Sequence, residues 1–274
     1  MYGNRPRVLL LASAPRFGAA NLGYLDDSEQ HTLDHRCSVV TSPEQDHDEL
    51  VKQIAARAAQ IQVRIANCTD RDVKVLCVSK GHEIKVKAAA FAAGFTDLGE
   101  NYAQELLAGA AALGAGASGS ASSPRWHFIG GLQSNKVRSL AGIVSLWQSV
   151  DRLSLAREIA TRAPGAQVLV QLDLAGISGR SGVEPAQAAE LVRNCLDMGL
   201  DVRGLMGVGV PGPPEESRFG FRRLSALADE LALPERSMGM SNDLEVAVSE
   251  GSTMVRVGSS LLGPRMSRSR DSDA

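Results

Sequence analysis

The sequence of 274 residues has few cysteines, no marked excess of either charge and no long apolar run. Its 4 cysteines, Cys37, Cys68, Cys77 and Cys195, form no CxxC pair, so neither a zinc site nor a disulfide framework is indicated. The 29 Lys and Arg residues against 31 Asp and Glu give a net charge of −2, without the basic excess of a nucleic-acid surface. No run approaches the roughly 18 apolar residues of a membrane span. We therefore expect no metal, nucleic acid or membrane as a partner.

The apolar content and the start of the chain indicate the class of protein and its compartment. With 44% hydrophobic residues the chain is too apolar for a disordered protein, and its length suits one large domain or two small ones. Unpaired cysteines fit a reducing compartment. The apolar stretch Val8–Ala12 after Arg5 and Arg7 has the order of a secretory signal, but it is shorter than the 7 to 15 residues or so that such signals need. A cytoplasmic protein is expected.

The two ends of the chain differ in pattern from its middle. Residues 1–45 mix Gly, Pro, His and charges without periodicity, and residues 266–274 are short and polar. These patterns predict a poorly ordered N-terminal extension over 1–45, a folded domain over 46–265 and a disordered tail over 266–274. Leu50, Ile54, Ile61 and Ile65 lie at helical spacing. They predict an amphipathic helix over residues 47–67, ahead of the first strand.

After this helix, strand and helix patterns alternate. Apolar runs such as residues 75–78 and 168–174 lack polar alternation, which indicates strands covered on both faces. The expected strands are 73–80, 96–100, 125–130, 145–151, 167–174, 201–208, 236–240 and 253–258. About eight strands, each followed by a helix, are typical of an α/β protein with a single (β/α)8 TIM barrel. A doubly wound open sheet is the alternative.

Barrels of this kind build their sites at the carboxyl ends of the strands, and the first strand ends on a lysine. A period of two places Leu76, Val78 and Lys80 on one face, so Lys80 is expected at the mouth. Burial there lowers a lysine pKa, and the neutral amine can form a Schiff base. Alternatively, the side chain extends to water. Position alone leaves both interpretations open.

Two small-residue loops follow the seventh and eighth expected strands, where barrels often bind phosphate at helix N-termini. They are Ser237–Ser241, with sequence SMGMS, and Gly258–Ser260. Asn242, with Glu245 three residues later, has the form of a helix start. Either loop alone is better explained as an ordinary turn. Their occurrence at both expected strand ends favours a phosphate site.

Further polar residues are expected near this mouth. Arg256 is placed to direct its guanidinium into it, where it either faces the ring nitrogen of a pyridine cofactor or pairs with a carboxylate such as Glu100. Asn101 fits both a helix N-cap and a contact with the cofactor ring. His127 lies within a strand, so a hydrogen-bonded core histidine is expected there.

Six short motifs, in order between Asp48 and Arg265, closely resemble the pyridoxal phosphate homeostasis protein family. They are VSK at 78–80, GENY at 99–102, WHFIG with LQSNK at 126–136, RGLM at 203–206, SMGMS at 237–241 and GSTMVRVG at 251–258. The resemblance implies a single barrel like the N-terminal domain of alanine racemase. It also implies pyridoxal 5'-phosphate held as an internal aldimine, with the family lysine at Lys80.

The resemblance assigns a cofactor-binding set and no catalytic residue. The phosphate loops, the ring-nitrogen arginine and the asparagine of the family fall on Ser237, Met238, Gly239, Gly258, Ser259, Arg256 and Asn101. Ser259 stands where the family usually has Thr, so the hydroxyl is kept. Gly81, His82 and Arg180 also depart from the common pattern, which affects surface details and not the cofactor.

Three functions remain to be compared. The first is a carrier that stores or delivers pyridoxal phosphate in vitamin B6 homeostasis, with PLP-dependent apoenzymes as candidate partners. The second is an amino acid racemase or decarboxylase, and the third is a Schiff-base aldolase without a cofactor. Relatives that turn over amino acids add a second domain, and little sequence follows Arg265. A cation near the ring nitrogen also weakens the ring as an electron sink. We therefore expect the carrier, not an enzyme, as a monomer with a dimer left open.

Overall fold

The computed structural model of the chain describes residues 43–115, 122–176 and 181–265. The chain divides into two units, residues 1–40 and 41–274, and all of the described residues belong to the second. The expected tail over 266–274 lies outside the described residues, as does the expected extension up to residue 42. Residues 43–45 of that extension form the start of the first helix.

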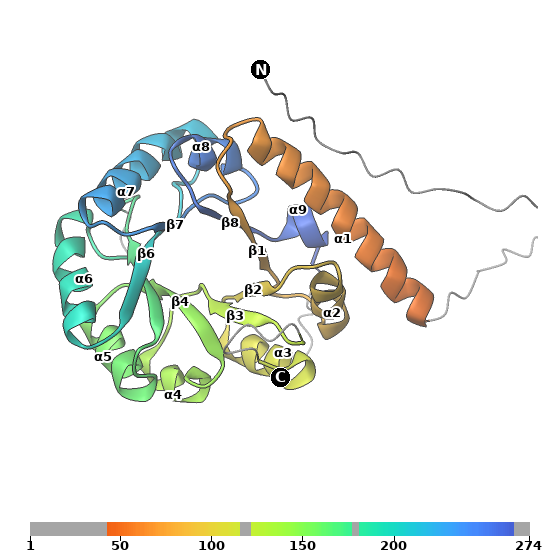
Figure 1. Ribbon diagram of the computed structural model, residues 1–274, viewed down its shortest axis with the longest axis horizontal. Coiled ribbons are helices and arrows are strands. Elements are labelled where there is room, and N and C mark those ends of the chain that lie inside the picture. The colour runs from red at the N-terminus through yellow and green to blue at the C-terminus, as the bar shows by residue number, and fades with distance from the viewer. Residues whose placement is uncertain (1–42, 116–121, 177–180, 266–274) are drawn as a thin grey trace, which may run out of the picture. The chain divides into compact units, whose positions relative to one another are not determined.

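Eight parallel strands form a closed barrel, as the sequence predicts (Figure 1). Strand β1 pairs with β2 on one side and with β8 on the other, with Leu76 opposite Arg256. This closure rules out the open-sheet alternative. The strands are β1 (Lys74–Val78), β2 (Asp97–Glu100), β3 (Arg125–Phe128), β4 (Val144–Val150), β5 (Gln167–Leu172), β6 (Asp201–Gly207), β7 (Glu235–Ser237) and β8 (Met254–Val257).

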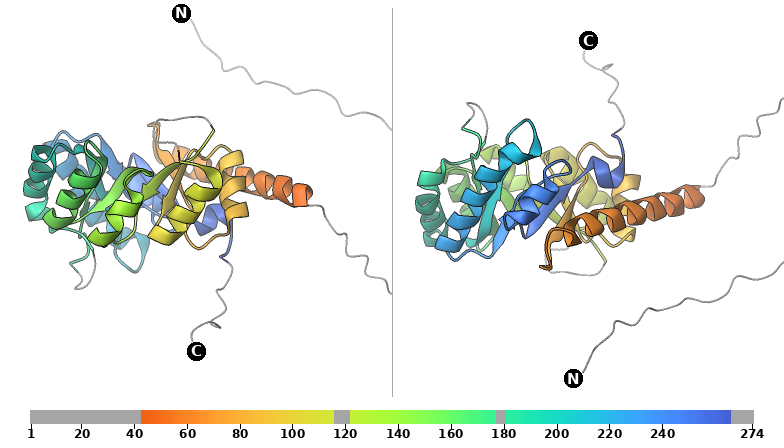
Figure 2. Two further views of the ribbon diagram at one scale, coloured as in Figure 1. Left: turned by 90° about the horizontal axis from the view of Figure 1, so that it is seen from below. Right: turned by 90° about the horizontal axis from the view of Figure 1, so that it is seen from above.

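A helix follows each strand, and the helices surround the barrel (Figures 1 and 2). They are α2 (Ile84–Ala92), α3 (Ala103–Leu113), α4 (Val137–Leu140), α5 (Leu153–Arg162), α6 (Ala188–Asp197), α7 (Arg218–Glu230), α8 (Leu244–Ser249) and α9 (Ser259–Leu262). Short 3-10 turns at Ser134–Lys136, Pro185–Gln187 and Pro214–Ser217 lead into α4, α6 and α7. None of the described helices is both long and apolar enough to cross a lipid bilayer.

The additional helix α1 (Pro43–Ala66) precedes the barrel and packs against α2, α8 and α9. Its buried residues are Ile54, Ile61 and Ile65, which confirms the predicted apolar stripe. On the same helix, Arg64 donates hydrogen bonds to both carboxylate oxygens of Glu245 in α8, at 2.6 and 2.9 Å, and to the Ser241 carbonyl at 3.0 Å. Helix α1 therefore supports the loop between β7 and α8.

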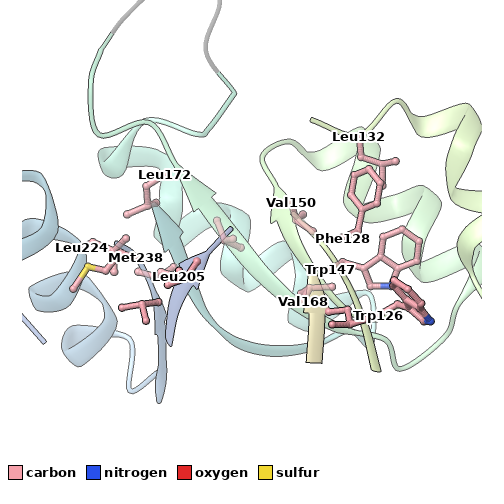
Figure 3. Packing of buried hydrophobic residues seen from close by; sticks show 14 of the residues in the cluster. Trp126, Phe128, Leu132, Trp147, Val150, Val168, Leu172, Leu205, Leu224 and Met238 are labelled. Atoms are coloured by element: carbon pink, nitrogen blue, oxygen red, sulfur yellow. The ribbon is translucent and has the colours of Figure 1, made fainter. Parts of the chain in front are cut away.

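The apolar core has two layers, separated by the barrel wall. Leu76, Leu146, Leu169, Met206 and Met254 form a small cluster of their own. These residues alternate along their strands with residues of the larger cluster, which includes buried residues of the surrounding helices. Part of the larger cluster, with two tryptophans next to Phe128 and Leu132, is drawn in Figure 3. The small cluster therefore lies in the barrel interior, where Ile129 and Val208 of the cavity wall pack against it.

Candidate functional site

A cavity of about 520 Å³ opens at the carboxyl ends of the strands. Its walls come from β1, β8 and the loops that follow β1, β2, β3, β6, β7 and β8. This volume lies in the range of pockets that hold a small-molecule ligand or cofactor. The described residues contain no group of three His, Cys, Asp or Glu side chains that fits a metal ion. The volume of the cavity is what suits a small organic ligand.

Lys80 lies two residues beyond the end of β1 and lines this cavity. Its side chain is half-buried. Burial lowers the pKa of its ammonium group, and the positive charges of Arg265 and Arg256 lower it further against the opposing effect of Glu100 and Glu105. The amine of Lys80 therefore loses its proton at a lower pH than an exposed lysine does.

Arg256 provides a buried positive charge in the wall of the same cavity. Its guanidinium donates to the Ser237 carbonyl at 2.6 Å, the Ser237 hydroxyl at 2.9 Å and the Gly207 carbonyl at 2.8 Å. Burial lowers its pKa to about 10, against the opposing charge of Asp243. The group therefore stays cationic at neutral pH. Because its hydrogen bonds go to these oxygens, the expected alternative of an ion pair with Glu100 is wrong.

Glu100 instead belongs to a buried ion pair behind the cavity wall. One of its carboxylate oxygens accepts a hydrogen bond from Lys87 in α2 at 2.7 Å and another from the Ser79 hydroxyl at 2.6 Å. The side chains of Lys87 and Glu100 are 2% and 0% exposed. Burial raises the pKa of Glu100, although Lys87 and Ser79 oppose the shift. This pair fixes the chain immediately before Lys80.

Asn101 reaches the cavity directly after β2. Its side-chain oxygen is buried and has no hydrogen-bond partner among the described residues. Gly130 allows the two loops to meet, because a Cβ atom there would lie 2.2 Å from the Asn101 carbonyl oxygen. Helix α3 begins at Ala103 after Tyr102, so the expectation that Asn101 caps it is wrong. An unpaired buried acceptor is instead available to a ligand.

The loops after β7 and β8 together form one side of the cavity. Ser241, Asn242, Gly258 and Ser259 line it, and the Ser241 hydroxyl lies 2.8 Å from that of Ser260. The first N–H groups of a helix lack an intrahelical acceptor, and α9 begins at Ser259. The residue before α8 is Asp243, not Asn242, and its carboxylate accepts a hydrogen bond from the Met240 N–H at 2.6 Å. The expected helix start at Asn242 is therefore wrong by one residue.

The first half of the SMGMS loop lies behind the cavity wall. Ser237, Met238 and Gly239 are buried, and they are not among the described residues that line the cavity. Gly239 has φ +93°, and a Cβ atom there would lie 2.5 Å from that of Ala247. These residues shape the loop that presents Ser241 to the cavity. His127 is also buried, bonded to Asp97 and Gln148, which confirms the predicted core histidine.

Comparison with known proteins agrees with this architecture. The family described as "Alanine racemase, N-terminal domain" matches residues 38–266. A "Pyridoxal phosphate homeostasis protein" from Pseudomonas aeruginosa is 37% identical over 227 residues, which cover 77% of this chain and 96% of that protein. A protein of the same name from Aquifex aeolicus is 39% identical over 221 residues, covering 76% of this chain and 92% of the relative.

This chain belongs to the pyridoxal phosphate homeostasis protein family. A solved structure of PipY from Synechococcus elongatus, with PLP bound, is 32% identical, with a TM-score of 0.65 over 77% of this chain and 100% of PipY. Alanine racemase from Corynebacterium glutamicum is 17% identical, with a TM-score of 0.61 over 77% of this chain and 60% of the racemase. At 17% identity, the similarity to the racemase supports the barrel fold of this chain and no statement about its activity.

Sequence reasoning missed two residues that contribute to the site. Arg265 lines the cavity and lowers the pKa of Lys80, yet it follows the last helix with no pattern to single it out. Gln148 is fully buried in β4 and bonded to Ser237. A glutamine at a period of two from the apolar Leu146, on the same face of the strand, is a signal that was available in the sequence.

Proposed function

We propose that this chain binds pyridoxal 5'-phosphate in the cavity at the barrel mouth and acts in the homeostasis of this cofactor. PipY, which this chain matches over the whole length of PipY, was solved with PLP bound. The observation that carries the proposal is the meeting of two groups in one cavity of this chain. These are the half-buried amine of Lys80, with its lowered pKa, and the buried guanidinium of Arg256.

The residues of the cavity fit the three parts of the cofactor. When bound, pyridoxal phosphate supplies an aldehyde that an unprotonated amine attacks reversibly, together with a pyridine ring and a phosphate dianion. Lys80 provides the amine. Arg256 orients the ring through its nitrogen, and Asn101 offers a polar atom that the protein leaves unpaired. The hydroxyl of Ser259 and the N–H groups that follow Gly258 suit the phosphate.

We assign Ser237, Met238 and Gly239 a supporting part in this site. None of the three is among the described residues that line the cavity, and the Ser237 hydroxyl accepts a hydrogen bond from Arg256. They hold the loop whose later residues, Ser241 and Asn242, line the cavity. In this proposal they act on the cofactor through Arg256 and through the path of the main chain.

We propose that the protein holds the cofactor without a catalytic cycle on amino acids. The titratable side chains among the described cavity residues are Lys80, Asp243, Arg256 and Arg265. The Asp243 carboxylate is held by the Met240 N–H, and two of the others are arginines. Racemisation needs a second acid or base with a pKa near the working pH, on the opposite face of the bound substrate. A cationic Arg256 at the ring nitrogen also disfavours protonation of the ring, which weakens its electron-withdrawing effect.

Release of the cofactor to PLP-dependent apoenzymes in the cytoplasm completes the proposal. The aldehyde of free pyridoxal phosphate reacts with exposed amines, so a bound reserve limits damage. A reversible bond to Lys80 suits both storage and release. The monomeric state expected from the sequence stays a prediction.

Titration with pyridoxal phosphate, followed by visible absorption, tests binding. Wild-type protein should develop a visible absorption band that Lys80→Ala lacks. Lys85→Ala, which changes a lysine with a side chain that is 71% exposed, should behave as wild type. The loaded protein is then incubated with both enantiomers of several amino acids, and optical purity and carbon dioxide are followed. Sustained turnover that is lost in Lys80→Ala would replace the carrier by an enzyme. Absence of the band from wild type would reject cofactor binding.

A further inference from the structure

A line of hydrogen-bonded side chains crosses the barrel interior from the cavity to the opposite end. Arg256 donates to the Ser237 hydroxyl at 2.9 Å, and Ser237 donates to the Gln148 side-chain oxygen at 2.7 Å. The Gln148 amide nitrogen lies 2.8 Å from His127 Nδ1, and His127 Nε2 lies 2.8 Å from an oxygen of Asp97. These five residues belong to β8, β7, β4, β3 and β2. We call them the interior relay.

The interior relay is shielded from solvent along its length. Its members are at most 7% exposed, and only Arg256 is among the described residues that line the cavity. The apolar interior cluster, which includes Leu146, Leu169 and Met206, shares the barrel with it. Polar groups in such surroundings are costly unless each finds a partner. A break at one position therefore leaves a buried group unsatisfied and alters its neighbours.

The hydrogen bonds of the relay all run in one direction. Ser237 gives its proton to Gln148, so the hydroxyl oxygen is free to accept from Arg256. Gln148 then presents its amide N–H to His127 Nδ1, which makes Nδ1 an acceptor and leaves the ring proton on Nε2 to bond Asp97. Every donor points from the guanidinium toward the carboxylate. This alignment is the one that a cation and an anion at the two ends favour.

The far end of the relay is anchored independently of the cavity. Asp97 also accepts a hydrogen bond from Arg125 at 2.5 Å. Burial alone would raise the pKa of Asp97, but its interactions with His127, Lys74 and Arg125 lower it overall. Asp97 is therefore a fixed negative charge that sets the proton position on His127.

We propose that Gln148 and His127 are positioning residues that act through Ser237 on Arg256 and so fix the guanidinium at the cofactor ring. This inference rests on the proposed function, because it assigns Arg256 its role toward the cofactor. Without Gln148 the Ser237 hydroxyl loses its acceptor and is free to rotate, and Arg256 then loses a fixed partner. Neither Gln148 nor His127 needs to touch the cofactor for this effect.

The first test uses the protein without cofactor. Side-chain ¹⁵N NMR should show the ring proton of His127 on Nε2, with Nδ1 as the hydrogen-bond acceptor. In Gln148→Met, which keeps the length of the side chain but not the amide, the guanidinium protons of Arg256 should exchange with water faster than in wild type. A proton on Nδ1 of His127, or unchanged Arg256 exchange, would overturn the relay whether or not the protein binds pyridoxal phosphate.

The second test uses the cofactor and a matched control. Gln148→Met and Ser237→Ala should each lower the affinity for pyridoxal phosphate about three- to tenfold, the loss of one net hydrogen bond. Met206→Leu, a volume-conserving change in the same interior, should stay within about twofold of wild type. Because both changes act through one contact, the double variant should be no weaker than either single variant. The proposal would be contradicted if the affinity losses of the two single variants multiplied in the double variant. An affinity of Gln148→Met equal to that of Met206→Leu would also contradict it.

The absorption band of the bound cofactor supplies a readout that a loss of folding stability would not move. Its maximum and the pH at which it changes should shift in Gln148→Met and not in Met206→Leu. Failure of wild-type protein to bind pyridoxal phosphate would reject the proposed function, whereas the His127 and Arg256 measurements would still decide the relay. Identical bands in all three proteins would reject the positioning role alone.

Discussion

Replacing Lys87 by methionine should strongly destabilise the protein, because it leaves a carboxylate buried without its cation. Lys87 and Glu100 are 2% and 0% exposed and their charged atoms lie 2.7 Å apart. Methionine keeps most of the length and apolar contact of the lysine stem. After the change, one carboxylate oxygen of Glu100 still accepts a hydrogen bond from the Ser79 hydroxyl. The other oxygen has no hydrogen-bond partner among the described residues.

The expected loss is about 3 to 5 kcal/mol of unfolding free energy, the range for breaking one side of a buried pair. Its pH dependence has a defined sign. Burial already raises the pKa of Glu100, and loss of Lys87 raises it further. In the unfolded chain, a glutamate carboxyl has a pKa of about 4.3. The loss should therefore be smallest below that pH, where Glu100 is protonated in both states, and should grow as pH rises through its folded-state pKa.

Urea unfolding followed by circular dichroism measures this effect. A loss of this size moves the urea midpoint by about 1 M or more. In the double variant Lys87→Met with Glu100→Gln most of the stability should return, because no buried charge is left. Lys85→Met, a change at an exposed lysine of the same helix, is the control and should change stability by less than about 0.5 kcal/mol. A Lys87→Met loss below about 1 kcal/mol, or a double variant as unstable as the single one, would refute the reasoning.

Three further predictions concern the cavity and the chain ends. The rate at which pyridoxal phosphate attaches to Lys80 should level off at a lower pH than for an exposed lysine. Arg265→Gln removes a positive charge near Lys80, so it should move this plateau to higher pH. Stopped-flow absorption at several pH values measures the plateau, and an unmoved plateau in Arg265→Gln would contradict the prediction. Unphosphorylated pyridoxal should bind at least tenfold more weakly than the phosphate, since a charge-assisted hydrogen bond contributes about 1.5 to 3 kcal/mol; equal dissociation constants would remove the phosphate role from Gly258 and Ser259. Removing residues 1–42 and 266–274 should leave the affinity within about twofold, because the described cavity is built from residues 78–265; a large loss in equilibrium titration would show that an end contributes to the site.

The sequence predicts the barrel and the main cavity residues because both follow from local periodicity. Alternation along β1 places Leu76 in the barrel interior and carries Lys80 to the mouth, and the same rule places Arg256. The carboxyl ends of parallel strands meet at one edge, so residues far apart in sequence converge there. Five of the assigned residues line the cavity: Lys80, Asn101, Arg256, Gly258 and Ser259.

What the sequence does not show depends on the register between strands and on exact helix starts. Glu100 follows Gly99, and its side chain lies on the outer face of β2, where Lys87 of α2 meets it. Arg256 points into the barrel, so Glu100 and Arg256 lie on opposite sides of the barrel wall and cannot pair. The alternation of side chains shows this once the inward face of each strand is known. The contact of Gln148 with His127 needs the shift in register between β3 and β4. No local pattern encodes that shift.

The attachment point of the cofactor tests the central claim most directly. Protein loaded with pyridoxal phosphate is reduced with borohydride, digested, and its peptides are mapped by mass spectrometry. The account predicts a phosphopyridoxyl group on Lys80, because this half-buried lysine lines the mouth cavity and has a lowered pKa. A group found mainly on Lys136, which lines a separate cavity, or on Lys74 at the opposite end of β1, would contradict it.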